Sequence, residues 1–163
     1  MAEYLRPACA IILPNLGGFA GLFVTRSSNS RNWYQNLNKP SWRPSGGVIG
    51  PIWTYLYCTM GYASYLVWRD GGGFDGRARL PLAVFGAQLA LNWAWTPIFF
   101  GAKKLGLATI EIVALWGAIV ATIVTFKPIN KTASYLLLPY LGWISVASCI
   151  NYSIWMNNKN RQD

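Results

Sequence analysis

Residues 105–126 read LGLATIEIVALWGAIVATIVTF, an apolar run that contains a single charged residue, Glu111. A helix that crosses a lipid bilayer needs roughly 20 mostly apolar residues, and this run meets that requirement by itself. Four further stretches of similar character lie at about 6–25, 48–68, 80–101 and 133–156. The sequence therefore predicts an all-α membrane protein, a bundle of five transmembrane helices that forms a single membrane domain over residues 1–163.

The composition of the 163-residue chain is that of a membrane protein. Hydrophobic residues make up 53% of it and charged residues only 12%, against the roughly 25% that is usual in soluble domains. The formal net charge of +9 does not indicate a nucleic-acid-binding protein, because the basic residues separate the apolar runs instead of forming one stripe. We expect them to lie beside lipid headgroups, with membrane lipid and no nucleic acid as a partner.

The connections between the runs predict how the helices are arranged. Short links make neighbouring helices antiparallel, so the first and third loops share one side with the C-terminus. That side carries eight Lys and Arg residues and the other side six, a bias that favours a cytosolic C-terminus. The first loop, at about 26–47, holds Trp33, Tyr34 and Trp42. It is too aromatic for a solvated tether, and we predict that it packs over one end of the bundle as a lid.

Several kinds of chemistry are absent from the sequence. There is no histidine, and Cys9, Cys58 and Cys149 lie far apart inside apolar runs, so no metal site is expected. Neither a catalytic triad nor a carboxylate pair is present. We predict no metal, no cofactor and no catalytic residue, and an enzyme is the less favoured class.

Aromatic residues recur at helical spacing in two of the predicted spans. Trp53 and Tyr57 share one helix face, and Trp143, Ala147 and Ile150 share another. If these faces point inward, they form an aromatic pocket suited to a flat, largely apolar ligand. The alternative is ordinary aromatic packing or anchoring at the membrane interface.

The third predicted span carries two amides and a row of small residues. Gln88 and Asn92 lie near its middle, where an amide exposed to lipid is costly, so they either join helices or line a wet cavity. Gly86, Ala90 and Ala94 follow each other at intervals of four. Such a stripe allows close approach of another helix and predicts a homodimer.

Glu111 is the one acidic residue within a predicted span. A carboxylate inside the membrane is a candidate functional group, which would suit a transporter. The alternative is an ion pair with Lys103 or Lys104 at the near end of the helix.

Several motifs, in order along the chain, resemble those of a known family. Residues 33–53 include Trp33-Tyr34, Lys39-Pro40-Ser41-Trp42 and Pro51-Ile52-Trp53, residues 88–101 read QLALNWAWTPIFFG, and residues 139–152 include PYLGW and Asn151-Tyr152. This pattern, which covers about residues 7–156, resembles the translocator protein family, also called peripheral-type benzodiazepine receptors or tryptophan-rich sensory proteins, in an animal-type member.

The resemblance implies a five-helix bundle, often dimeric, with a pocket under the first loop that binds porphyrins, cholesterol-related lipids and benzodiazepine-type drugs. It also implies the mitochondrial outer membrane as the location. By position, the ligand-binding residues would be Ile49, Gly50, Ile52, Trp53, Asn92, Trp95, Leu107, Ile110, Ala114, Trp143, Ala147 and Ile150.

The chain departs from the family at two places. Leu107 stands where mammalian members often have tryptophan, which removes an aromatic wall. The C-terminal sterol motif is degenerate: Val146 and Tyr152 match it, but Met156 replaces the usual arginine and Lys159 lies one residue too far.

The leading hypothesis is a receptor that binds cholesterol or porphyrin inside the bundle and acts in mitochondrial lipid or tetrapyrrole handling and steroid metabolism. Outer-membrane protein partners are a further expectation. Two alternatives stay open. One is an enzyme in which Trp53 and Trp143 help to oxidise a bound porphyrin in light, and the other is a transporter of lipid or porphyrin.

Overall fold

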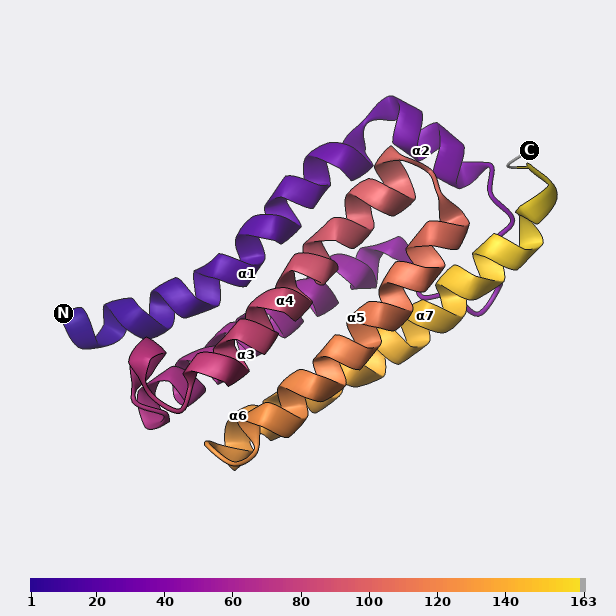
Figure 1. Ribbon diagram of the computed structural model, residues 1–163. Coiled ribbons are helices and arrows are strands. Elements are labelled where there is room, and N and C mark those ends of the chain that lie inside the picture. The colour runs from indigo at the N-terminus through magenta and orange to yellow at the C-terminus, as the bar shows by residue number, and fades with distance from the viewer. Residues whose placement is uncertain (162–163) are drawn as a thin grey trace.

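The computed structural model describes residues 1–161, which form helices and short connections without any strand. Five long helices run roughly side by side (Figure 1): α1 (Ala2–Arg26), α3 (Gly46–Asp70), α4 (Arg79–Thr96), α5 (Leu105–Phe126) and α7 (Leu138–Asn157). The shorter elements are α2 (Ser28–Gln35), η1 (Gly73–Asp75), η2 (Pro97–Gly101), α6 (Lys131–Leu136) and η3 (Lys159–Arg161). The all-helical prediction is confirmed.

Three segments are long and apolar enough to cross a membrane by length and composition: Ala2–Arg26, Leu105–Phe126 and Lys131–Asn157. The segment predicted at 105–126 coincides with α5. When the turn η2 is counted with α4, the helices α1, α3 and α4 also begin and end within a few residues of their predicted bounds. α3 and α4 are not among these segments, because the tyrosines and tryptophans of α3 and the two amides, two tryptophans and Arg79 of α4 are less apolar than aliphatic residues. Membrane crossing by these two helices stays a prediction.

Two connections differ from the sequence-based expectation. The span predicted at 133–156 is interrupted at Leu137, two residues before Pro139, whose ring leaves no backbone N–H for the helix ladder. The loop expected at about 26–47 contains the helix α2, which begins where the hydroxyl of Ser27 accepts a hydrogen bond from the backbone N–H of Ser30 at 3.2 Å. This is the usual role of serine at a helix N-cap.

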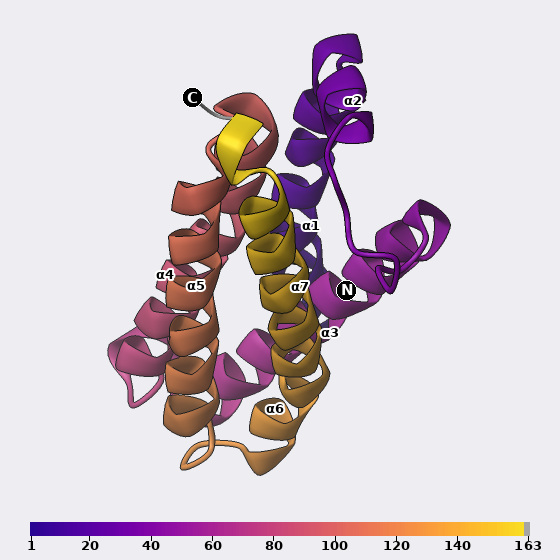
Figure 2. The ribbon, with the colours of Figure 1, turned by 90° about the vertical axis from the view of Figure 1, so that its right-hand side faces the viewer.

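Each long helix packs against its neighbours around the bundle. α1 packs on α3 and α4, α4 packs on α5, α5 packs on α7, and α6 packs back on α3; Figure 2 shows α5 and α7 side by side. The core lies among α3, α4, α5 and α7 and includes the fully buried Met60, Leu115 and Tyr140. α1 lies at the outside of this core, and Pro14 is its one buried residue.

Close contact between α1 and α3 depends on a glycine. A Cβ atom placed on Gly61 would lie 2.3 Å from the backbone oxygen of Ala10 and 2.7 Å from the Cα atom of Ile11. Pro14 has no N–H to donate to the Ala10 carbonyl four residues earlier, so that carbonyl is free to point away from its own helix. Because Gly61 has no side chain, the backbone of α3 can lie directly against the Ala10 carbonyl of α1.

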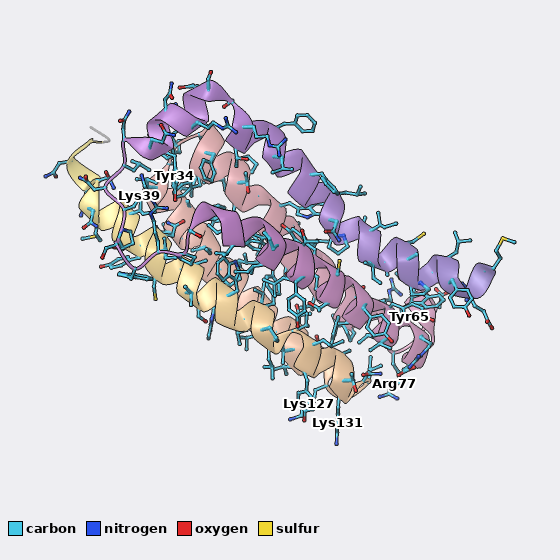
Figure 3. The ribbon with its side chains drawn as sticks, turned by 180° about the vertical axis from the view of Figure 1, so that it is seen from behind. Tyr34, Lys39, Tyr65, Arg77, Lys127 and Lys131 are labelled. Atoms are coloured by element: carbon cyan, nitrogen blue, oxygen red, sulfur yellow. The ribbon has the colours of Figure 1, made fainter. Side chains whose placement is uncertain are left out.

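The two ends of the bundle carry different parts of the chain. α2, the turn between α4 and α5, and the end of α7 lie together, whereas the N-terminus, η1 and α6 lie at the other end (Figure 1). This is the arrangement that the short connections predicted. Figure 3 shows Tyr34 and Lys39 at the first end and Arg77, Lys127 and Lys131 at the other.

Candidate functional site

Two tryptophans from helices far apart in the sequence meet between α3 and α7. The rings of Trp53 and Trp143 lie 6.4 Å apart, edge to face, with an interplanar angle of 89°. Trp53 also stacks on Tyr57 at 5.3 Å and meets the edge of Tyr140 at 6.4 Å. The two aromatic faces that the spacing predicted therefore face each other.

The indole N–H of Trp143 is buried and has no hydrogen-bond partner within residues 1–161. Buried donors are nearly always paired in folded proteins, because an unpaired one loses its hydrogen bond to water without replacement. The side chain is half-buried as a whole and packs against the core together with Ile52 and Ala147.

A directed chain of hydrogen bonds joins α3, α4 and α7 beside the tryptophans. The hydroxyl of Tyr57 donates to Oδ1 of Asn92 at 2.7 Å, Nδ2 of Asn92 donates to the hydroxyl of Tyr140 at 2.7 Å, and that hydroxyl donates to Oε1 of Gln88 at 2.9 Å. All four residues are buried. The amides at 88 and 92 therefore join helices, as one of the two interpretations predicted.

Trp95 packs against both the main core and the smaller apolar cluster at the end of the bundle. Its indole N–H donates to Oδ1 of Asn151 at 2.9 Å, and Nδ2 of Asn151 donates to the hydroxyl of Thr109 at 2.6 Å. The ring stacks on Phe99 at 4.7 Å. Trp95 is thus held in one orientation by both its polar and its apolar parts.

The structure brings only part of the predicted ligand-binding set together. Leu107 and Ile110 are 48% and 67% exposed, on the face of α5 opposite its buried residues. Gly50 has open space around it. The residues that gather at the core or at its end are Ile52, Trp53, Asn92, Trp95, Trp143, Ala147 and Ile150, whereas Ile49 is half-buried near the start of α3 and Ala114 is exposed.

The two other predicted surface features lie on the outside of the bundle. A Cβ atom placed on Gly86 would meet nothing within 4 Å, Ala90 is exposed and Ala94 is half-buried, so the small-residue stripe faces outward on α4. Val146 and Tyr152 of the degenerate sterol motif are exposed on α7. The ammonium of Lys159 lies 5.8 Å from the ring centre of Trp155.

Glu111 is buried on α5, and neither carboxyl oxygen has a hydrogen-bond partner within the described chain. The ion pair with Lys103 or Lys104 is wrong: the one salt bridge in residues 1–161 joins Arg69 and Asp70. Glu111 is buried between helices, whereas the lysines precede α5, and Lys103 donates to Asn29 at 3.0 Å.

The first part of the loop is packed onto the turn between α4 and α5. Trp33 meets the ring of Phe99 at 5.7 Å, and Tyr34 meets that of Phe100 at 5.4 Å. The hydroxyl of Ser30 donates to the Phe100 carbonyl at 3.3 Å. The predicted lid therefore does cover one end of the bundle, through α2.

Lys39 holds the end of α2. Its ammonium donates to the carbonyls of Tyr34 at 2.6 Å, Leu37 at 3.1 Å and Gln35 at 3.3 Å, and it lies 4.6 Å from the ring centre of Tyr34. The last carbonyls of a helix lack partners within the helix, and a cation there interacts favourably with the helix dipole. Lysine at this position thus has a local structural role.

Asn158 fastens the loop to the end of α7. Its Oδ1 accepts from the backbone N–H of Asn38 at 2.9 Å, while Nδ2 donates to the carbonyls of Asn38 at 2.9 Å and Ile154 at 2.7 Å. The side chain is almost fully buried. Sequence reasoning missed this contact, because an asparagine that follows a helix carries no signal of a partner 120 positions away.

We predict that Asn158→Ala releases the loop at Asn38 from the end of α7. Losing three hydrogen bonds of a buried amide is expected to cost about 2 kcal/mol locally, so the amide hydrogen of Asn38 should exchange with solvent about 30-fold faster. Hydrogen exchange with mass spectrometry measures this. Asn157→Ala is the matched control, because the Asn157 side chain is exposed. If the Asn38 amide exchanges equally fast in both variants, the Asn158 side chain does not hold the loop.

Comparison with known proteins places these features in a family. The sequence model of the TspO/MBR family matches residues 10–156. The translocator protein of Homo sapiens is 45% identical over 159 residues, which cover 97% of this chain and 94% of that protein. The translocator protein of Bos taurus is 42% identical over 151 residues, covering 93% and 89%. The tryptophan-rich protein TspO of Archaeoglobus fulgidus is 41% identical over 141 residues, covering 86% and 89%.

Proposed function

The chain belongs to the TspO/MBR family, and on that premise we propose that it is a membrane receptor which binds a sterol or a porphyrin between α3 and α7. The observation that carries the proposal is the pair of Trp53 and Trp143, whose rings meet edge to face beside Tyr57 and Tyr140. Aromatic walls bind flat apolar ligands through their ring faces. The unpaired N–H of Trp143 would donate to an oxygen of the ligand.

We further propose how this receptor lies in its membrane and how two copies of it meet. All five long helices would cross the membrane, with the lid and the C-terminus in the cytosol, because that end carries the larger share of basic residues. The outward stripe of Gly86, Ala90 and Ala94 would be the contact between two copies. On the resemblance to animal members, the membrane would be the mitochondrial outer membrane.

The test is a titration of the purified protein with protoporphyrin, followed by the absorbance of the porphyrin. Native protein should bind saturably, and Trp53→Ala and Trp143→Ala should each weaken binding on the order of 10-fold, the loss expected for one aromatic wall. Trp116→Ala is the matched control, because Trp116 is partly exposed on α5 and its indole N–H donates to Ser145 and not to the aromatic pair. Cholesterol should compete for the same site.

Saturable binding that both variants leave unchanged would overturn the site. Trp143→Phe refines the test, since it keeps an aromatic wall and removes the N–H donor. If Trp143→Phe weakens binding less than Trp143→Ala does, the difference between the two losses is the contribution of the aromatic ring at position 143.

The edge-to-face pair also favours a second candidate, light-driven oxidation of the porphyrin. If the same mixtures are illuminated, a receptor should lose porphyrin no faster than detergent alone. Faster loss that requires Trp53 and Trp143 would favour the enzyme. Transport, the remaining candidate, is supported by the unpaired carboxyl of Glu111 inside a span.

A further inference from the structure

Three basic side chains from two separate connections gather at the end of the bundle away from α2. Arg77 belongs to the connection between α3 and α4, Lys127 follows α5, and Lys131 begins α6. Figure 3 shows all three at this end, and all three are exposed. We call Arg77, Lys127 and Lys131 the basic cluster.

Two hydrogen bonds between the connections hold the basic cluster together. Nη2 of Arg77 donates to the carbonyl of Pro128 at 3.4 Å, which places the guanidinium beside the residue that follows Lys127. Nδ2 of Asn130 donates to Oδ2 of Asp70 at 2.6 Å. The tertiary structure therefore brings together cations that lie about 50 positions apart in the chain.

Within residues 1–161, no carboxylate forms an ion pair with the basic cluster. The one salt bridge of this part joins Arg69 to Asp70 at 2.6 Å, and Asp70 also accepts from Asn130. Residues 69–79 and 127–131, which include both connections, hold five basic and two acidic residues. The surface thus has an excess of positive charge, which attracts an anion from outside the chain.

The basic cluster lies where the membrane segments end. Leu105–Phe126 and Lys131–Asn157 are two of the three segments that are long and apolar enough to cross a membrane. Lys127 is the first residue after the former, and Lys131 is the first residue of the latter. Because the hydrocarbon layer ends where apolar runs end, both ammonium groups reach the layer of lipid headgroups. The anions nearest to them are therefore those of lipids.

A row of aromatic rings marks the same level on the neighbouring helix. Tyr65 of α3 stacks on Trp68 at 6.3 Å, and Trp68 meets Phe74 of η1 at 6.4 Å. The guanidinium of Arg6 lies 5.1 Å from the ring centre of Trp68. Tyrosine and tryptophan are enriched at the boundary between membrane and water. This row supports a lipid, and not a soluble molecule, as the partner of the basic cluster.

We propose that the basic cluster binds the headgroup of an anionic phospholipid that carries more than one negative charge. The planar guanidinium of Arg77 would contact a phosphate through paired donors, and the two lysines would act as point charges. Basic sites beside membrane helices bind headgroups with several phosphate charges in this way. The site lies at the opposite end from the lid and does not depend on the ligand proposed between α3 and α7.

Spin-labelled lipids in phosphatidylcholine membranes measure how strongly each lipid associates with the protein relative to phosphatidylcholine. Cardiolipin, which has two phosphates, should associate with native protein on the order of 10-fold more strongly, and added salt should reduce this preference. Phosphatidylglycerol, which has one phosphate, should be preferred only about 3-fold. In the triple variant Arg77→Gln/Lys127→Gln/Lys131→Gln, cardiolipin and phosphatidylcholine should associate within about 2-fold of each other.

The matched control removes three charges at the other end of the bundle, in the variant Arg26→Gln/Arg31→Gln/Lys104→Gln. These residues are exposed and lie at the end of α1, in α2 and before α5. An equal loss of preference in both triple variants would mean that overall charge attracts the lipid, and would overturn the site. Equal association of cardiolipin and phosphatidylglycerol with native protein would overturn it as well.

Arg77→Lys keeps the test decisive if the triple variant does not fold. It retains the charge and removes the paired donors, so part of the preference for cardiolipin should be lost. An unchanged preference would contradict the role of the guanidinium. If polyglutamate at equal total charge displaces cardiolipin from native protein, the partner is an acidic protein segment and the lipid site is wrong.

Discussion

Gly61→Ala is expected to lower the thermal midpoint of unfolding by roughly 10 °C, the shift that about 3 kcal/mol of overpacking produces in a chain of this size. The added methyl group would lie 2.3 Å from the Ala10 oxygen and 2.7 Å from the Ile11 Cα atom. Both are backbone atoms of α1, so no side-chain rotation relieves the clash. α1 must move away from α3, which is its principal neighbour.

Thermal unfolding in detergent, followed by helical circular dichroism, measures this effect. Gly117→Ala is the control, since Gly117 has nothing within 4 Å of the position where its Cβ would lie. Alanine is favoured over glycine in a helix by up to about 1 kcal/mol, so this variant should be as stable as the native protein or more stable. Similar losses in the two variants would show that α1 and α3 do not meet at Gly61.

Asn92→Leu is expected to cost about 2 kcal/mol of stability, the second-largest effect. Leucine has a similar shape but neither accepts from Tyr57 nor donates to Tyr140, so it removes two buried hydrogen bonds of 2.7 Å. It also leaves the Tyr57 hydroxyl unpaired in the core. Tyr57→Phe removes one of these bonds and should cost about 1 kcal/mol, near the upper values for hydrogen bonds between membrane helices.

The double variant Tyr57→Phe/Asn92→Leu decides whether the groups act together. Because the first substitution removes the donor that the second would leave unpaired, the combined loss should be smaller than the sum of the two single losses. Unfolding in mixed micelles of increasing denaturing detergent gives these free energies. Strict additivity would mean that the two side chains contribute separately.

The sequence predicted the helices of this protein well and their polar contacts poorly. Apolar runs and helical spacing are local properties, so α5 was predicted at its observed bounds and the aromatic faces of α3 and α7 were recognised. The helix α2 was missed, because the apolar-run criterion does not detect a short polar helix. Its start at Ser27 was the one signal available.

The predicted ligand set stays a prediction, but its members differ in where they lie. Trp53 and Trp143, which both helical spacing and resemblance pointed to, meet each other, whereas Leu107 and Ile110, which resemblance alone pointed to, lie on the exposed face of α5. Which face of an almost uniformly apolar helix turns inward is decided by its neighbours. α5 carries so few polar residues that its own sequence contains little of that information.

By itself the sequence determined the number and order of the long helices, the apolar character of the three segments that are long enough to cross a membrane, and the two aromatic faces, because each follows from residues within one helix. Only the tertiary structure decided that Asn92 joins Tyr57 to Tyr140, that Asn158 binds the loop 120 positions away, and that the Ser30 hydroxyl donates to the Phe100 carbonyl. These are contacts between segments distant in the chain. Their free energy depends on geometry that forms only when the helices pack.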